Sequence, residues 1–306
     1  MHSKIVKAHL SLFTAGCLWG LLAPIGKAAM DAGVTSLSLA SMRMIGAAIC
    51  FWIASLFVPK EKVSKHDLLL LFWAGLLCIV FNLGVFTVGL SLTSPVDSTI
   101  ITTTTPILTM LLAALFLKEP ITIVKVSGVV IGAIGALMLI LSNTGGSEIA
   151  GNIWGDIVCF IAQLSFALYL TLFKGLISRY NVFTLMKWMF TYSAVIIVFV
   201  SFRDFSGMAA QSFPFHVWLQ VGYVVFFGTF VAYILVLVGQ KTLRPTVVSS
   251  YNYIQPIVAT IVAVYIGMGT FGWLKAFASL LIFTGVFVVT KSKSREQMLQ
   301  EGTISG

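Results

Sequence analysis

Two apolar segments of the chain, residues 97–117 and 246–267, carry polar side chains and a proline on the same spacing. In the first segment the set is Thr99, Thr102, Thr103 and Pro106. In the second segment the set is Ser249, Asn252, Tyr253 and Pro256. Positions i, i+3, i+4 and i+7 share one face of a helix, so each set predicts a polar stripe. Hydroxyl and amide groups in such stripes can hydrogen-bond a polar solute.

Two interpretations of these stripes stay open. Each proline removes a backbone hydrogen bond and can free a carbonyl inside an apolar helix, so Pro106 and Pro256 are expected hinges beside a cavity. Alternatively, the threonine hydroxyls bond back to their own helix or join neighbouring helices. The amides of Asn252 and Gln255 cannot be satisfied so locally, which favours a cavity for these two.

Further polar and aromatic side chains within apolar stretches are candidates for the same cavity. They are Trp19, Asn82, Gln163, Tyr169, Thr229 and Tyr233. A buried amide needs several hydrogen-bond partners, which favours a binding role for Asn82 and Gln163. Trp19 and the tyrosines can equally be packing aromatics or anchors at a membrane interface.

Two cations, Arg43 and Lys187, also lie inside apolar segments. Each is about six residues from the end of its segment, or roughly 9 Å at 1.5 Å per residue. One hypothesis is that they attract an anionic group, such as a carboxylate, at opposite mouths of a pathway. The other is that each is a structural cation whose long side chain reaches the membrane surface.

The sequence shows no pattern of residues typical of an enzyme active site or a metal site. The histidines lie near the chain start, in loops or at segment ends: His2, His9, His66 and His216. The sequence has no His-Glu-x-x-His, and its four cysteines lack metal-ligand spacing. No Asp or Glu lies in the middle of an apolar segment, which argues against a site for organic cations. We expect no catalytic residue, no metal and no cofactor.

The elements that position these residues follow from composition. The chain has 306 residues, 58% hydrophobic and 9% charged, with a mean hydropathy of +1.02. A soluble chain carries roughly 25% charged residues, so this composition excludes a soluble globular protein. A bilayer core about 30 Å thick needs about 20 apolar residues per helix. Ten segments meet this length: 10–29, 37–58, 68–90, 97–117, 121–142, 152–173, 182–202, 216–239, 246–267 and 272–290. The sequence therefore predicts an all-α membrane protein with ten transmembrane helices.

The distribution of Lys and Arg predicts the orientation in the bilayer. Fourteen lie on the side that holds both termini, and three, Lys27, Arg203 and Lys275, lie on the other. Positive charge accumulates on cytoplasmic loops, so both termini are expected in the cytoplasm. The same rule explains the net charge of +9, and no basic run is interleaved with aromatics as in a nucleic-acid groove. We expect a multi-pass inner-membrane protein with no nucleic-acid partner.

The two halves of the chain resemble each other at an offset of 150 residues. This shift places Pro95 on Pro245 and Pro106 on Pro256. It also pairs Gly89 with Gly239, Ala113 with Ala263, Lys125 with Lys275 and Gly135 with Gly285. Each half contains five spans, and five is odd, so the second copy must cross the membrane in the opposite sense. Inverted repeats are typical of secondary transporters, because two similar halves can exchange inward-open and outward-open shapes.

The first half also carries loosely spaced motifs: Leu18-Trp19-Gly20 with Pro24, then Arg43, Pro106, Leu117-Lys118-Glu119-Pro120, Gly128, Gly132 and Gly135. With ten spans in two halves, these motifs resemble the drug/metabolite transporter superfamily, in its EamA-type branch. The second half departs from the pattern at Gly267-Met268-Gly269, where many members carry a Gly-Glu pair. The resemblance implies one EamA-type repeat over residues 1–145 and a second over 146–306, which ends in a short cytoplasmic tail. Pro24 in this pattern is a third expected hinge.

The resemblance implies a metabolite carrier, often an exporter. We therefore expect a secondary transporter that moves small organic solutes, amino acids or related neutral or anionic compounds, by alternating access across the inner membrane. The expected substrate-binding residues are Trp19, Arg43, Asn82, Thr99, Thr102, Gln163, Tyr169, Lys187, Tyr233, Asn252 and Gln255. They lie mainly on spans 1, 3, 4, 6, 8 and 9, of which 1, 3, 6 and 8 rest partly on the resemblance. The alternative is a passive facilitator or channel, because nothing in the sequence shows coupling to an ion gradient. The expected partners are a small-molecule substrate and the lipid bilayer, and the oligomeric state stays open.

Overall fold

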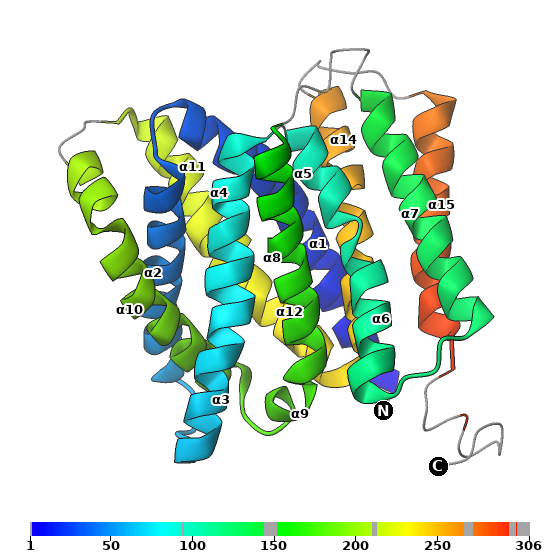
Figure 1. Cartoon of the computed structure of the whole chain (residues 1–306), viewed down its shortest axis with the longest axis horizontal. Helices are drawn as coiled ribbons and strands as arrows, with labels where there is room; N and C mark the ends of the chain where they lie inside the picture. The colour runs from blue at the N-terminus through cyan, green and yellow to red at the C-terminus, as the bar shows by residue number, and fades with distance from the viewer. Residues whose placement is uncertain are drawn as a thin grey trace.

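The computed structural model describes residues 2–93, 95–143, 152–209, 213–265, 272–293 and 298, and its regular structure in these ranges is helical throughout. The elements are α1 (His2–Asp31), α2 (Ser36–Ser55), α3 (Lys65–Gly75), η1 (Leu76–Gly84), α4 (Val85–Leu92), α5 (Pro95–Thr102), α6 (Thr105–Leu117), α7 (Ile123–Asn143), α8 (Ile153–Leu172), α9 (Lys174–Ile177), α10 (Val182–Ala209), α11 (Phe215–Val225), η2 (Phe226–Val231), α12 (Ala232–Thr242), α13 (Pro245–Ser250), η3 (Tyr251–Tyr253), α14 (Ile254–Tyr265) and α15 (Trp273–Lys291). They form one bundle in which the long helices run between two ends of the molecule (Figure 1). The all-helical fold predicted from the sequence is confirmed.

Eight helices in the described ranges are long and apolar enough to cross a membrane. They are Ser3–Asp31, Ser36–Ser55, Lys65–Leu92, Ser98–Leu117, Ile153–Leu172, Val182–Phe202, Phe215–Thr242 and Trp273–Lys291. Two segments that the sequence predicts as spans fall outside this set. The apolar part of α7 is shorter, Ile123–Met138, and the ninth predicted span is divided into α13, η3 and α14. A helical protein with several spans is therefore established, and the count of ten stays a prediction.

The bounds of the helical elements repeat at the 150-residue offset seen in the sequence. Helix α3 begins at Lys65 and passes into the π-helix η1 at Leu76. Helix α11 begins at Phe215 and passes into the π-helix η2 at Phe226. Other pairs of helices start at equivalent positions: Pro95 and Pro245 for α5 and α13, Ile123 and Trp273 for α7 and α15. The two halves therefore share local structure as well as sequence at this offset.

Short polar side chains set where several helices begin. The Thr35 hydroxyl accepts a hydrogen bond from the backbone N–H of Ser38 at the start of α2, at 3.2 Å. Ser64 accepts from the N–H of Asp67 at the start of α3, at 3.0 Å. At the end of α6, Lys118 has a φ of 51°, the left-handed conformation that often ends a helix. These local signals fix the turns between neighbouring helices.

Helices α7 and α15 pack side by side with their backbones in close approach (Figure 1). A Cβ atom on Gly285 would lie 2.5 Å from the backbone nitrogen of Gly132 and 2.7 Å from the carbonyl oxygen of Gly128. Any side chain at Gly285 would clash at these distances. The glycines at i and i+4 on α7 therefore allow a contact that larger residues would prevent.

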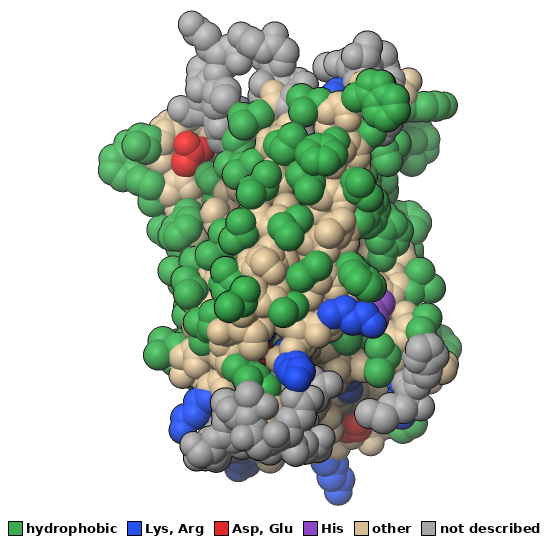
Figure 2. Space-filling view, turned by 90° about the vertical axis from the view of Figure 1, so that its right-hand side faces the viewer, with side chains coloured by type: hydrophobic (Ala, Val, Ile, Leu, Met, Phe, Trp, Pro, Cys, Tyr) green, Lys and Arg blue, Asp and Glu red, His purple; other side chains and the backbone are tan. Residues whose placement is uncertain are grey.

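The outer surface is apolar over most of its height. Figure 2 shows hydrophobic side chains across the face that it presents, with most of the visible Lys and Arg gathered toward its lower end. This is the end at which α1 begins and α15 ends (Figure 1). Large apolar side chains such as Phe199, 81% exposed, and Trp273, 92% exposed, stand on the surface. Exposed apolar surface on this scale is typical of a protein that contacts lipid.

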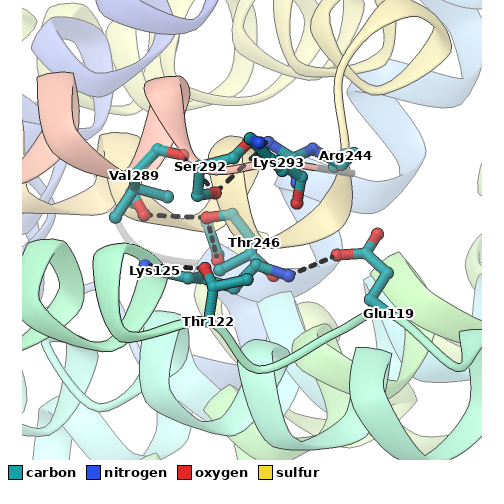
Figure 3. Close-up of polar contacts among 10 residues, drawn as sticks. Glu119, Thr122, Lys125, Arg244, Thr246, Val289, Ser292 and Lys293 are labelled. Carbon is teal, nitrogen blue, oxygen red and sulfur yellow. Dashed lines mark hydrogen bonds and ion pairs between the residues drawn. The ribbon is translucent and has the colours of Figure 1, made fainter. Parts of the chain in front are cut away.

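A buried ion pair joins Glu119, just after α6, to Lys125 on α7 (Figure 3). Lys125 Nζ is 3.0 Å from Glu119 Oε2, and the two side chains are 1% and 7% exposed. Beside this pair, Arg244 from the segment before α13 donates to the backbone carbonyls of Ser292 and Lys293 after α15. The cluster therefore places polar contacts of the first half next to those of the second half.

Candidate substrate-binding site

A cavity of about 70 Å³ lies among helices from both halves of the chain. Its lining comes from α1, α2, η1, α4, α5, α8, α12, η3 and α14. The lining residues are Trp19, Leu22, Ala23, Arg43, Asn82, Leu83, Phe86, Thr99, Thr102, Gln163, Phe166, Tyr233, Asn252 and Gln255. One water needs roughly 10–15 Å³ of such space, so the cavity has room for several waters or for part of a small solute.

Nine of the eleven predicted binding residues line this cavity, and Tyr169 and Lys187 do not. Tyr169 is fully buried, with its ring stacked against Phe166 on one side and Phe173 on the other. Lys187 is half-buried on α10, and its Nζ lies 4.9 Å from the centre of the Trp52 ring on α2. The structure therefore places Tyr169 in the packing of α8 and Lys187 at the contact between α10 and α2.

Arg43 is the one charged residue among the described residues that line the cavity. Its Nε donates to Thr229 Oγ1 at 3.0 Å, and its Nη1 donates to Thr87 Oγ1 at 3.1 Å. In the described ranges no carboxylate lies within ion-pair distance of this guanidinium. A guanidinium has five N–H donors and keeps its charge in proteins. Three donors and a positive charge therefore remain for an anionic group in the cavity.

The threonines that hold Arg43 come from the two halves of the chain, one within a π-helix and one shortly after the other π-helix. Thr229 lies within η2, and its hydroxyl donates to the carbonyl of Val224, five residues earlier, at 2.8 Å. Thr87 lies three residues after η1, and its hydroxyl donates to the carbonyl of Leu83 at 2.7 Å. π-Helical turns are rare and frequently occur at functional sites. Arg43 therefore bonds to η2 of the second half and to α4, just after η1, of the first half.

Aromatic side chains form an apolar wall beside the guanidinium. The Trp19 ring meets the rings of Phe166 and Tyr233 edge-on, with centres 6.0 and 5.8 Å away. Trp19 Nε1 donates to the carbonyl of Gly228 in η2 at 3.1 Å. This hydrogen bond fixes the indole against the second π-helical segment, so the wall is preorganised.

Four amide side chains contribute the other polar groups. Gln163 Oε1 accepts from the Thr105 hydroxyl at 2.7 Å, and Asn82 Nδ2 donates to a backbone carbonyl of α8 at 3.1 Å. Asn252 Oδ1 accepts from Gln255 Nε2 at 3.3 Å. Each amide has both donors and an acceptor, and these contacts use only part of that capacity. The remaining groups can hydrogen-bond a solute.

The helix that carries the first polar stripe is broken just before Pro106. Helix α5 ends at Thr102 and α6 begins at Thr105. Pro106 has no N–H for the carbonyl of Thr102, and the Thr105 hydroxyl lies 2.8 Å from that carbonyl, so its one proton is shared between this oxygen and Gln163 Oε1. The Thr102 hydroxyl donates to the carbonyl of Ser98 at 2.9 Å. Thr102 thus bonds back to its own helix and also lines the cavity, so the two interpretations of the stripe are compatible.

The second stripe is interrupted close to the equivalent place. The 3₁₀ turn η3 precedes Pro256, and Asn252 lies within that turn. Pro24, in contrast, lies inside the continuous helix α1 with an exposed side chain. The breaks therefore occur near two of the three prolines expected to be hinges, and the hinge role of all three stays a prediction.

Several residues of the site are missing from the sequence prediction. They are the lining residues Leu22, Ala23, Leu83, Phe86 and Phe166, together with Thr87, which holds Arg43. Apolar lining residues carry no signal in a chain that is apolar nearly everywhere. Thr87 resembles the other threonines of the apolar segments in bonding back to its own helix, and only its contact with Arg43 in the folded chain identifies it.

The polar groups of the lining are a guanidinium, amides and hydroxyls, and the described lining residues include no His, Cys, Asp, Glu or Lys. No group of three or more His, Cys, Asp or Glu is placed to hold a metal ion in the part of the chain that the structure describes. A cation, amides and an aromatic wall are instead suited to holding a small organic anion or zwitterion.

Comparisons with known proteins agree with a transporter. The model of the EamA-like transporter family matches residues 6–141 and 153–291. The uncharacterised transporter YyaM of Bacillus subtilis strain 168 is 26% identical over 78% of this chain and 80% of its own length. The uncharacterised inner membrane transporter YedA of Escherichia coli K12 is 25% identical over 92% of this chain and 90% of its own.

A crystal structure of another protein shares the fold. It superimposes with a TM-score of 0.72 at 18% sequence identity, over 94% of this chain and 98% of its own. The helical arrangement is therefore one that occurs in a solved structure. Because the family model covers most of the sequence, this chain belongs to the EamA-like transporter family, within the drug/metabolite transporter superfamily.

Proposed function

We propose that this transporter carries small organic solutes with an anionic group, including zwitterions, through the cavity that Arg43 lines. The observation that carries the proposal is the buried guanidinium of Arg43, which is 4% exposed. Its hydrogen-bond partners among the described residues are two threonine hydroxyls, and no carboxylate lies within ion-pair distance. A buried charge is costly unless it is paired or hydrogen-bonded, and an anionic solute would complete its pairing. Amino acids and small organic acids have the required carboxylate.

Arg43, Asn82, Gln163, Asn252 and Gln255 are the proposed polar contacts of the solute. Aromatic contact comes from Trp19 and Tyr233, and hydroxyl contact from Thr99 and Thr102. Tyr169 is proposed to support this wall from behind, because its ring stacks on Phe166.

We propose ten spans in two inverted repeats, over residues 1–145 and 146–306. The shared element bounds at the 150-residue offset support this arrangement. So do the two segments matched by the family model. Helix α1 begins at the lower end of the bundle, whereas α8 leads down to α9 at that end and therefore runs the opposite way (Figure 1). Inverted halves supply two similar shapes that can be exchanged.

Alternating access is the proposed mechanism. The breaks at 103–104 and 251–253 interrupt helical hydrogen bonding beside the cavity, so the half-helices on either side can tilt against each other. Arg43 hydrogen-bonds one helical segment of each half, so a solute that binds Arg43 would alter contacts in both halves.

The proposed location is a cell inner membrane with both termini in the cytoplasm. The name of YedA as an inner membrane transporter supports the location, and the lower-end position of Lys and Arg supports the orientation (Figure 2). Net export is proposed from the family resemblance.

Proteoliposomes that contain the purified chain test this proposal. They are preloaded with unlabelled amino acids and organic acids, and uptake of a labelled mixture is followed by class of compound. We expect uptake of carboxylate-bearing solutes that is lost in Asn252→Ala. Uptake of organic cations in preference to acids would overturn the proposed substrate class.

A further inference from the structure

A surface groove separate from the cavity runs between α2 and α10, which lie side by side (Figure 1). Its volume is about 610 Å³. The residues that define it include Ile45, Ile49, Trp52, Thr191, Val195 and Phe199. Several of them are strongly exposed, Phe199 at 81% and Ile49 at 55% among them. The groove therefore opens onto the apolar outer surface that faces lipid.

A cation lies at one end of this groove. Lys187 Nζ is 4.9 Å from the centre of the Trp52 ring and 6.0 Å from that of Trp188. The Thr191 hydroxyl accepts from Trp52 Nε1 at 2.8 Å and donates to the Lys187 carbonyl at 2.6 Å. These hydrogen bonds join α2 to α10 at this end of the groove. No carboxylate lies within ion-pair distance of Lys187 in the described ranges. The ammonium is therefore left without an anionic partner from the described chain.

The position of this cation matches that of a lipid headgroup. Helix α2 ends at Ser55 and α10 begins at Val182, both at the lower end of the bundle (Figure 1). Lys187 lies near that end, and the groove continues away from it along residues 191–199, for about 12 Å at 1.5 Å per residue. Tryptophans favour the depth of the membrane interface, and a lysine side chain can extend toward it.

We propose that the groove binds an anionic phospholipid, with an acyl chain along α2 and α10 and the phosphate against Lys187 Nζ. Charge complementarity selects this occupant, because a zwitterionic headgroup brings its own cation to compete for the phosphate. A lysine near an anionic membrane surface contributes about 1 kcal/mol, which corresponds to about a fivefold preference for the anionic lipid. This site does not depend on the proposed transport function.

Native mass spectrometry of the full chain tests the proposal. The protein is mixed with phosphatidylglycerol and phosphatidylcholine of identical acyl chains, and the lipid retained most tightly is identified. We expect about fivefold more phosphatidylglycerol than phosphatidylcholine on the wild type, and equal retention on Lys187→Gln. Lys291→Gln is the matched control, because Lys291 also lies over an aromatic ring, that of Phe287 at 5.5 Å, but outside the groove. It should keep the fivefold preference.

A second variant tests the groove itself. Val195→Trp places a large side chain at a groove position that is 53% exposed, so it can fill the space without disturbing the core. We expect it to retain less of both lipids. A preference that persists in Lys187→Gln, or is equally lost in Lys291→Gln, would overturn the role of Lys187. Undiminished lipid retention by Val195→Trp would refute the proposal that the lipid binds in this groove.

Discussion

Replacement of Arg43 by glutamine removes the charged donor around which the proposed binding site is built. The wild-type guanidinium uses two N–H groups on threonine hydroxyls and keeps three for a solute. A hydrogen bond to a charged group contributes about 1.5–3 kcal/mol, and 1.4 kcal/mol is a factor of ten in affinity. Loss of one such contact should therefore raise the KM for a carboxylate-bearing solute roughly ten- to a hundredfold.

The assay is initial uptake into proteoliposomes at a series of solute concentrations, with equal amounts of folded protein confirmed by size-exclusion chromatography. Arg43→Lys is the matched control, since it keeps the charge and loses the planar guanidinium. The KM of this variant should lie between those of the wild type and Arg43→Gln. A neutral solute, if transported, should show little change. An unchanged KM in Arg43→Gln would refute the substrate role. Loss of folded protein would favour a structural cation instead.

Three further changes test the site and the packing. Thr229→Val removes one acceptor of the cavity guanidinium and leaves Arg43 Nε without its partner, so the displaced charge should raise the KM for acids severalfold. Gly285→Ala forces a Cβ against the α7 backbone at a cost of about 1–3 kcal/mol, and the melting temperature in detergent should fall. Glu119→Gln leaves buried Lys125 unpaired at a cost of about 3–5 kcal/mol, again seen in melting, and the added change Lys125→Met should recover most of the loss.

Each of these changes has a result that contradicts its argument. Gly222→Ala is the control for packing, because its added Cβ would meet no atom within 4 Å, and an equal fall there would refute the close-contact explanation. A double variant at Glu119 and Lys125 that melts no higher than Glu119→Gln would show that the unpaired charge is not the cause. An unchanged KM in Thr229→Val would show that this hydrogen bond does not position the guanidinium for the solute.

The helical class follows from the sequence, and nine of the predicted residues lie around one cavity, while their binding of a solute stays a prediction. Amides such as Asn82 and Gln163 are so costly to bury alone that their presence in apolar spans indicates a shared polar space. The prolines at 106 and 256 likewise marked the neighbourhood of the two helix breaks.

Other features depend on three-dimensional packing and left no local signal. Tyr169 and Trp19 have the same amphipathic chemistry, but only Trp19 lines the cavity, whereas Tyr169 lies one turn beyond Phe166 on α8 and packs against Phe173. The π-helical turns were also unpredictable, since the segment 76–84 reads as an ordinary apolar helix. Lys187 looked equivalent to Arg43 in the sequence, and the fold places it against Trp52 instead.

The most direct test of a carrier with a single cavity compares preloaded and empty proteoliposomes. Initial uptake of the best labelled acid is measured with and without the same unlabelled acid inside. Alternating access predicts faster uptake into preloaded vesicles, because the binding site returns to the outward-open state more quickly when it carries internal solute. This stimulation should vanish in Asn252→Ala. Uptake that is equal in loaded and empty vesicles would contradict the carrier mechanism and indicate a passive facilitator.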